Sequence, residues 1–187
     1  AFLIVYVICR SLQDNQRDMT EKSTLQKMLV SQIQWIVTKE LKYPREVILV
    51  VGPPNSGKTS YIQRVFKPKF IHMNQDISSD IYQWYTHDGI LILEVKKDDQ
   101  NPQLLTSIQQ VLIKKFKKRF TQSVIVLDLP GLLNLSEQDH WMYRFQAPKI
   151  QMDLVISHMD QLVGYHEVNR YIDAELLAKQ LNYQLSS

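Results

Sequence analysis

The chain has 187 residues, 44% hydrophobic and 22% charged, a composition typical of one folded domain rather than of a disordered chain. Its formal net charge of +3 is too small to indicate a nucleic-acid partner by itself. The single cysteine, Cys9, excludes an intramolecular disulfide and a cysteine-rich metal site. It favours an intracellular reducing compartment, either nucleus or cytoplasm.

Residues 1–44 predict an N-terminal segment ahead of the main domain, which we regard as a candidate oligomerisation segment. Residues 1–9 are apolar or aromatic. We expect them to form a buried strand or helix and no membrane span, since a span needs about 20 apolar residues. Residues 11–20 are polar and predict a linker. From Leu25 to Leu41 apolar residues recur at steps of three and four, which predicts an amphipathic helix.

The pattern then changes to strands that alternate with helices. The strands are expected at residues 47–51, 70–73, 90–95, 123–129 and 153–157, and the helices at 59–66, 104–116 and 174–181. Such alternation predicts an α/β domain over residues 45–187, with a largely parallel sheet flanked by helices.

The eight residues from Gly52 to Thr59, GPPNSGKT, fit the phosphate-binding pattern G-x-x-x-x-G-K-[S/T] between a predicted strand and a predicted helix. In such a loop the backbone N–H groups surround phosphates, Lys58 reaches the β- and γ-phosphates, and the Thr59 hydroxyl binds Mg²⁺. We therefore predict a nucleoside triphosphate, taken to be ATP, with Mg²⁺ as cofactors. The expected binding residues are Gly52, Pro53, Pro54, Asn55, Ser56, Gly57, Lys58, Thr59 and Ser60.

Two predicted strands end on a carboxylate that could organise the metal. One apolar run stops at Glu94 and the other at Asp128. Enzymes with this loop place an acid at the carboxyl end of a neighbouring strand, where it holds Mg²⁺. Residue patterns alone do not rank the two acids.

From about Trp35 to Phe145 the chain resembles the helicase domain of replication-initiator (Rep) proteins of small circular single-stranded DNA viruses, which are superfamily-three, AAA+-related P-loop NTPases. The resemblance lies in the Gly-Pro-Pro loop and in three further segments, Trp84–Val95, Val124–Asp128 and Leu135–Trp141. It implies an ATP-driven helicase or translocase that forms a homo-oligomeric ring and acts in DNA replication. Lys58, Glu94 and Asp128 would be its catalytic residues, with Glu94 joining Thr59 at the metal.

The chain departs from that family at two positions. Asp128 stands where the family has a sensor asparagine, and His140 stands where it has an arginine. These departures put unwinding in doubt and leave open a scaffold that binds nucleotide with weakened turnover.

A basic run is the densest charge cluster of the chain. In a ring helicase it would grip single-stranded nucleic acid through phosphate contacts. A solvated helix end with favourable cations explains it equally well. The run comprises Lys114, Lys115, Lys117, Lys118 and Arg119.

Two other P-loop functions are alternatives. Asp76, in Asn74-Gln75-Asp76, resembles the general base of a polynucleotide-kinase-like enzyme. Asp128-Leu129-Pro130-Gly131 resembles the D-x-x-G motif of GTPases, and residues 157–160 (Ser-His-Met-Asp) stand in for their guanine motif. Because that motif has Asn or Thr followed by Lys, His158 argues against the GTPase, which we rank below the kinase.

Overall fold

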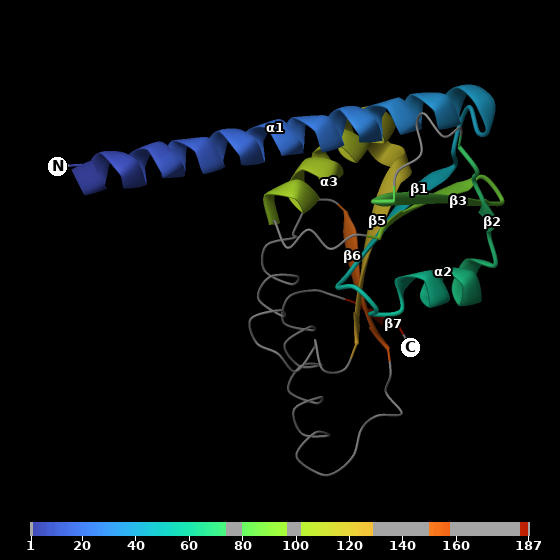
Figure 1. Cartoon of the computed structure of the whole chain (residues 1–187). Helices are drawn as coiled ribbons and strands as arrows, with labels where there is room; N and C mark the ends of the chain where they lie inside the picture. The colour runs from blue at the N-terminus through green and yellow to red at the C-terminus, as the bar shows by residue number, and fades with distance from the viewer. Residues whose placement is uncertain (1, 74–79, 97–101, 129–149, 158–183, 187) are drawn as a thin grey trace, which may run out of the picture.

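The computed structural model describes residues 2–73, 80–96, 102–128, 150–157 and 184–186, and the statements below concern those parts of the chain (Figure 1). The described strands form one sheet in the order β2-β3-β4-β1-β5-β6-β7. Strands β4, β1, β5, β6 and β7 run parallel to one another, whereas β3 is antiparallel to both β4 and β2. Their bounds are β1 Glu46–Val51, β2 Lys69–Phe70, β3 Tyr82–His87, β4 Ile90–Val95, β5 Phe120–Asp128, β6 Gln151–Ser157 and β7 Gln184–Ser186.

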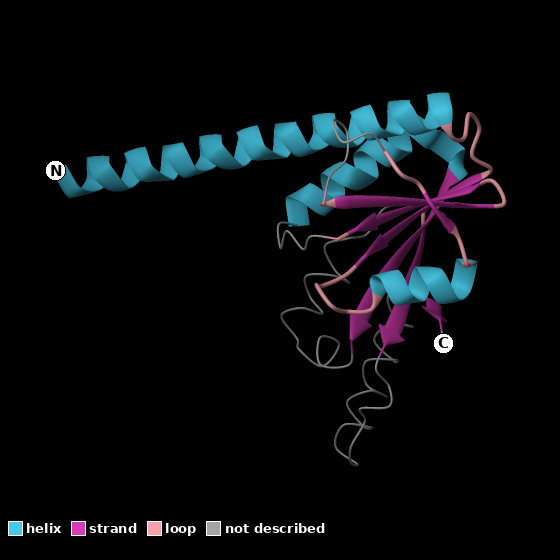
Figure 2. Ribbon diagram, turned by 45° about the vertical axis from the view of Figure 1, so that its right-hand side comes forward, coloured by secondary structure: helices cyan, strands magenta, loops and turns pink. Residues whose placement is uncertain are grey.

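Helices cover both faces of this sheet. Helix α1 (Phe2–Lys39) and helix α3 (Pro102–Phe116) lie on one face, and α2 (Lys58–Phe66) lies on the other (Figures 1 and 2). A short 3₁₀ helix, η1 (Lys117–Arg119), joins α3 to β5. The predicted α/β P-loop fold, with a largely parallel sheet flanked by helices, is confirmed.

Strand β3 was absent from the predicted elements, and it forms a hairpin with β4. The turn between them is Asp88-Gly89, with φ of 47° and 78°. Both residues have positive φ, as a tight hairpin turn requires, and an Asp-Gly pair between two apolar runs is a strong signal for such a turn. The predicted helix at residues 174–181 lies outside the described residues.

Helix α1 is longer than predicted, because residues 11–20 are helical and form no linker. No glycine or proline precedes Pro44, and most of the polar side chains in this stretch are tolerated in a helix. The helix ends where the Leu41 N–H donates to the carbonyl of Ile36, shortly before Pro44. In the described part of the chain no helix is both long and apolar enough to cross a membrane.

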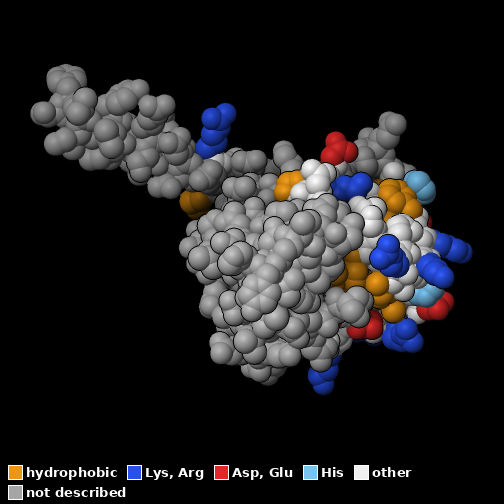
Figure 3. All heavy atoms as spheres, turned by 90° about the horizontal axis from the view of Figure 1, so that it is seen from below, with side chains coloured by type: hydrophobic (Ala, Val, Ile, Leu, Met, Phe, Trp, Pro, Cys, Tyr) orange, Lys and Arg blue, Asp and Glu red, His pale blue; other side chains and the backbone are white. Residues whose placement is uncertain are grey.

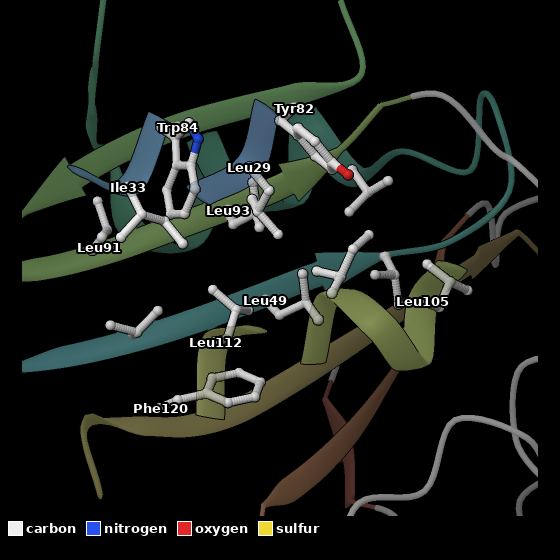
Figure 4. Packing of buried hydrophobic residues seen from close by; sticks show 14 of the residues in the cluster. Leu29, Ile33, Leu49, Tyr82, Trp84, Leu91, Leu93, Leu105, Leu112 and Phe120 are labelled. Carbon is white, nitrogen blue, oxygen red and sulfur yellow. The ribbon is translucent and has the colours of Figure 1, made fainter. Parts of the chain in front are cut away.

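The carboxyl-terminal half of α1 packs against the sheet. Leu29 and Ile36 are fully buried, as the predicted amphipathic pattern requires, and burial of each such side chain stabilises the fold by about 1.5–3 kcal/mol. They meet Trp84, whose indole N–H donates to Gln32 Oε1 at 2.8 Å. Figure 4 shows α1, β3, β4 and α3 contributing to this cluster. The contact fixes α1 over β3 and β4.

The opposite face holds a smaller apolar cluster beneath α2. Ile62 of α2 is fully buried there against side chains of the central strands. The strand residues of this cluster are Ile48, Val50, Tyr85, Ile92, Val124, Val126 and Val155. Strand β1 is therefore buried on both faces, as expected of a central parallel strand.

Candidate nucleotide site

The phosphate loop turns sharply between β1 and α2 because three of its residues have positive φ. These are Gly52 at 150°, Asn55 at 60° and Gly57 at 91°. Glycine adopts such angles at little cost, and asparagine tolerates the left-handed region better than most residues do. A turn of this kind directs backbone N–H groups into a concave surface at the start of a helix, which favours anion binding.

Gly52 is required for space as well as for its backbone angle. An added Cβ would lie 2.1 Å from the carbonyl oxygen of Val126 on β5. The loop therefore begins in direct backbone contact with the neighbouring strand. Any larger residue at position 52 would push the loop and β5 apart.

Lys58 is held within the loop. Its ammonium donates to the carbonyl oxygens of Gly52 and Pro53, each at 2.8 Å, and the side chain is buried. These bonds fix the charge at the base of the loop. Lys58 is thus placed to contact phosphate oxygens, as its motif position predicts.

Glu94 and Thr59 meet at the carboxyl end of β4. The Thr59 hydroxyl donates to Glu94 Oε1 at 2.6 Å, and the Tyr85 hydroxyl donates to Glu94 Oε2 at 2.7 Å. Glu94 and Tyr85 are both only 2% exposed. Burial, and then the hydrogen bond to Glu94, raise the pKa of Tyr85 well above its ordinary value, so that the phenol stays a donor.

The donor set suits Mg²⁺, which takes oxygen ligands from hydroxyl, carboxylate, water and phosphate. Thr59 would bind the ion, and Glu94 would hold its waters. Among the described residues no group of three His, Cys, Asp or Glu could hold a metal alone. The ion would therefore need oxygen atoms of the nucleotide as well, which is the usual arrangement for Mg²⁺ at a phosphate loop.

A cavity of about 460 Å³ opens between the loop and β4, within the range of ligand sites. Its polar lining includes Lys96, two residues after Glu94, and Lys96 was not among the predicted site residues. The only signal for it in the sequence was a lysine close behind the strand-ending acid. The lining residues are Pro54, Asn55, Gly57, Lys58, Thr59, Ser60, Glu94 and Lys96.

Strand β6 also reaches the loop. The hydroxyl of Ser157, its last residue, donates to the Ser56 carbonyl at 2.6 Å. The side chain of Ser56 is fully buried beneath the loop. Residue 157 opens the Ser-His-Met-Asp segment, so this segment starts beside the phosphate loop.

Asp128 lies on β5, on the other side of β1 from β4. Its backbone partner is Ser157 of β6, and it lies three residues beyond Ile125, where the pairing of β5 with β1 ends, roughly 10 Å at strand rise. Glu94 instead pairs with Val50, inside β1. Of the two acids, the structure brings Glu94 to Thr59. The side chain of Asp128 and the residues of Leu135–Trp141 and Asp76 lie outside the described parts.

The basic run lies at the amino-terminal ends of the strands, whereas the phosphate loop follows the carboxyl end of β1. Lys114 and Lys115 end α3, and Lys117–Arg119 form η1 just before the first residue of β5. All five side chains are exposed, and the Arg119 guanidinium stacks 5.6 Å from the Tyr43 ring. Lys114 and Lys115 lie in the last turn of α3, where cations interact favourably with the helix dipole. Figure 3 shows the molecule from below, with Lys and Arg side chains interspersed with Asp, Glu and His side chains on the described part of that face.

The comparisons with known proteins decide the family. A family model described as 50S ribosome-binding GTPase matches residues 47–185. The chain belongs to this GTPase family. It is therefore a P-loop nucleotide-binding domain, and its membership implies a nucleoside-triphosphate hydrolase. No curated protein matches the sequence.

Solved structures with low sequence identity are similar to the chain. The small COPII coat GTPase SAR1 from Encephalitozoon cuniculi, in complex with GDP, has 9% identity and a TM-score of 0.46, over 91% of this chain and 80% of that one. The G domain of the T. maritima FeoB iron transporter has 15% identity and a TM-score of 0.46, over 75% and 84%. Bacterial elongation factor EF-Sec has 13% identity and a TM-score of 0.48, over 76% of this chain but 25% of its own.

The expected relationship to Rep helicases is wrong, because the matching family is a GTPase family. The phosphate loop that suggested it is common to many NTPases, and Trp84–Val95 forms an antiparallel hairpin. ATP, helicase activity, DNA replication, a single-stranded nucleic-acid partner and a ring have no support in this family, nor does the kinase alternative. The low rank given to a GTPase was likewise wrong.

Proposed function

We propose that the chain binds GTP with Mg²⁺ and hydrolyses it to GDP. The observation that carries the proposal is the convergence of Lys58, Thr59 and Glu94 on one cavity, in a member of a GTPase family. Lys58 contacts the β- and γ-phosphates, Thr59 binds the ion, and Glu94 orients water on it. When bound, Mg²⁺ neutralises charge that develops on the transferring phosphoryl group.

Guanine selectivity is assigned to Asp160. A carboxylate matches the two N–H donors on the edge of guanine, whereas adenine presents an acceptor there. Ser157 supports this assignment, since its hydroxyl bonds to the Ser56 carbonyl and the segment therefore starts beside the phosphate loop. Serine in place of Asn or Thr keeps a group able to make this bond. His158 remains a departure from the motif.

Slow turnover is the second candidate, in which the chain serves as a nucleotide-binding module. Glu94 is followed by Val95, Lys96 and Lys97, so the acid that meets Thr59 does not begin a D-x-x-G motif. Position 97, where the glycine of that motif would stand, is a lysine. In GTPases this part of the chain belongs to a segment that is ordered around the γ-phosphate. The D-x-x-G pattern of the sequence instead begins at Asp128, on the other side of β1.

Nucleotide binding and turnover test both candidates. The full chain, freed of nucleotide, should bind fluorescent GDP at least about 10-fold more tightly than ADP, because one charged hydrogen bond contributes about 1.5–3 kcal/mol. Asp160→Asn should lower GDP affinity and raise affinity for xanthosine diphosphate. Equal affinity for GDP and ADP would contradict the guanine assignment.

Single-turnover measurement with excess protein then separates hydrolysis from binding. Production of GDP that slows about 10- to 100-fold in Glu94→Gln supports the GTPase. Tight GTP binding without GDP production supports the module.

A further inference from the structure

Tyr85 contacts the magnesium-organising acid, yet neither the phosphate-binding motif nor the family assignment gives it a role. It lies on β3, opposite Ile92 of β4. Because side chains alternate across a sheet, residues 92 and 94 share a face, and a tyrosine opposite residue 92 can reach diagonally to residue 94. The 2.7 Å bond from its hydroxyl to Glu94 Oε2 is that diagonal contact.

The position of the Tyr85 ring is fixed from several sides. Phe70 of β2 meets it edge-on, with ring centroids 5.8 Å apart and planes at 85°. The ring also belongs to the buried cluster beneath α2. A rigid, buried ring delivers its hydroxyl to one place, which is what a group that orients another side chain must do.

Glu94 therefore receives one donor on each oxygen. Thr59 donates to Oε1, and Tyr85 donates to Oε2. A hydroxyl has one hydrogen and two lone pairs, so once Thr59 donates to the carboxylate its lone pairs are left for a cation. Each carboxylate oxygen keeps a lone pair for a water on that cation. The two donors thus set the orientation of the carboxylate and of the threonine together.

We propose that Tyr85 is a positioning residue for the magnesium site, holding Glu94 in the orientation in which it and Thr59 engage a nucleotide-bound Mg²⁺. The proposal rests on the proposed function and adds a residue of β3 to its site. Removal of the phenol oxygen leaves Glu94 Oε2 buried without this donor, and the carboxylate then turns more freely. Groups that orient metal ligands typically contribute 10- to 100-fold to metal affinity or activity.

Tyr82 supplies a matched control on the same strand. It is 3% exposed, and its hydroxyl donates to the Leu25 carbonyl of α1 at 3.5 Å, on the opposite face of the sheet. Tyr85→Phe and Tyr82→Phe remove the same atom from similarly buried rings. Only the first removes a donor from Glu94, so a general loss of packing or stability would affect both variants.

The test is an Mg²⁺ titration of fluorescent GTP-analogue binding at equilibrium, using the full chain, Tyr85→Phe, Tyr82→Phe and Glu94→Gln. Tyr85→Phe is expected to raise the half-maximal Mg²⁺ concentration about 10-fold. Its nucleotide affinity in excess EDTA should be unchanged, and so should the Mg²⁺ curve of Tyr82→Phe. Circular dichroism and thermal unfolding without nucleotide would establish that both variants are folded.

Three results would overturn the proposal. A Tyr85→Phe curve within about 2-fold of wild type, with Glu94→Gln shifted, shows that Glu94 needs no positioning by Tyr85. Equal shifts in both tyrosine variants show a structural effect. Absence of nucleotide binding by the wild-type chain would refute the proposed function itself, a result distinct from the other two.

Discussion

The two sides of β1 contribute to the nucleotide site in different ways. Strand β4 supplies a side chain, the Glu94 carboxylate, which meets Thr59 directly. Strands β5 and β6 support the loop: the Val126 carbonyl lies against Gly52, and the Ser157 hydroxyl bonds to the Ser56 carbonyl. One side therefore carries the chemistry of the metal, and the other holds the shape of the loop that binds phosphate. Substitutions on the β4 side should therefore change the Mg²⁺ requirement, and substitutions on the β5 and β6 side should change the stability of the loop and its affinity for nucleotide.

Removal of the Lys58 ammonium, which lies in the loop between β4 and β5, is expected to have the largest effect. Lys58→Ala deletes the ammonium from the loop, and truncation of one partner of a buried charge pair costs about 2–5 kcal/mol, or roughly 30-fold or more in affinity for GTP. Fluorescent nucleotide titration measures it. Lys27→Ala, at an exposed site on α1, is the control. Unchanged affinity in Lys58→Ala would remove the basis of the site.

The β5 side is tested by Gly52→Ala, which should act on stability. The added Cβ must displace the Val126 carbonyl, and overpacking typically costs about 1–3 kcal/mol before backbone strain is added. Gly89→Ala is the matched control, since its φ is +78° but its Cβ would lie 3.6 Å from the nearest atom, an ordinary contact. Urea unfolding should show the larger loss for Gly52→Ala. Equal losses would mean that backbone angle alone matters.

The two strand-ending acids give the sharpest contrast. Glu94→Gln is expected to lower single-turnover GTP hydrolysis about 10- to 100-fold, because it disturbs the group that orients the metal and its water. Asp128→Asn should change the rate by less than about 3-fold, because Asp128 ends β5, on the other side of β1 from Glu94 and Thr59. If Asp128→Asn had the larger effect, the assignment of the acid to β4 would be wrong.

The smallest effect on nucleotide affinity among the site substitutions is expected from Ser157→Ala. The variant loses one hydrogen bond between β6 and the phosphate loop, and a typical net contribution is about 0.5–1.5 kcal/mol. We expect up to roughly a 10-fold loss of GDP affinity, with the Mg²⁺ requirement unchanged because the β4 side is intact. Ser60, exposed in the first turn of α2, was predicted to contact the nucleotide. Ser60→Ala tests that contact in the same assay.

Features specified by local sequence were predictable. The phosphate loop needs glycines at fixed spacings between a strand and a helix, and strands β1 and β4 with helices α2 and α3 lie close to their predicted ranges. The contact of α1 with the sheet was predictable from the apolar residues that recur at steps of three and four from Leu25 to Leu41. Each of these follows from steric or periodic demands within a short stretch of chain.

Features that depend on strand order were not predictable. Glu94 and Asp128 both end apolar runs, and only the sheet order, with β4 and β5 on either side of β1, shows which acid meets Thr59. Tyr85 and Ser157 reach the site across 9 and 101 residues of sequence. The GTPase family was ranked low because His158 departs from the guanine motif, a departure that the family match overrides.

Trp84 and Tyr85 are neighbours in sequence but face opposite sides of β3. The indole of Trp84 bonds to Gln32 of α1, and the phenol of Tyr85 bonds to Glu94 beside the loop. Both side chains belong to one strand, so a shift of β3 would displace the contact with α1 and the contact with Glu94 together. The buried Trp84 indole, 1% exposed, is also an intrinsic fluorophore, and once Trp35 and Trp141 are replaced by phenylalanine its emission would report on a shift of β3 without any added label.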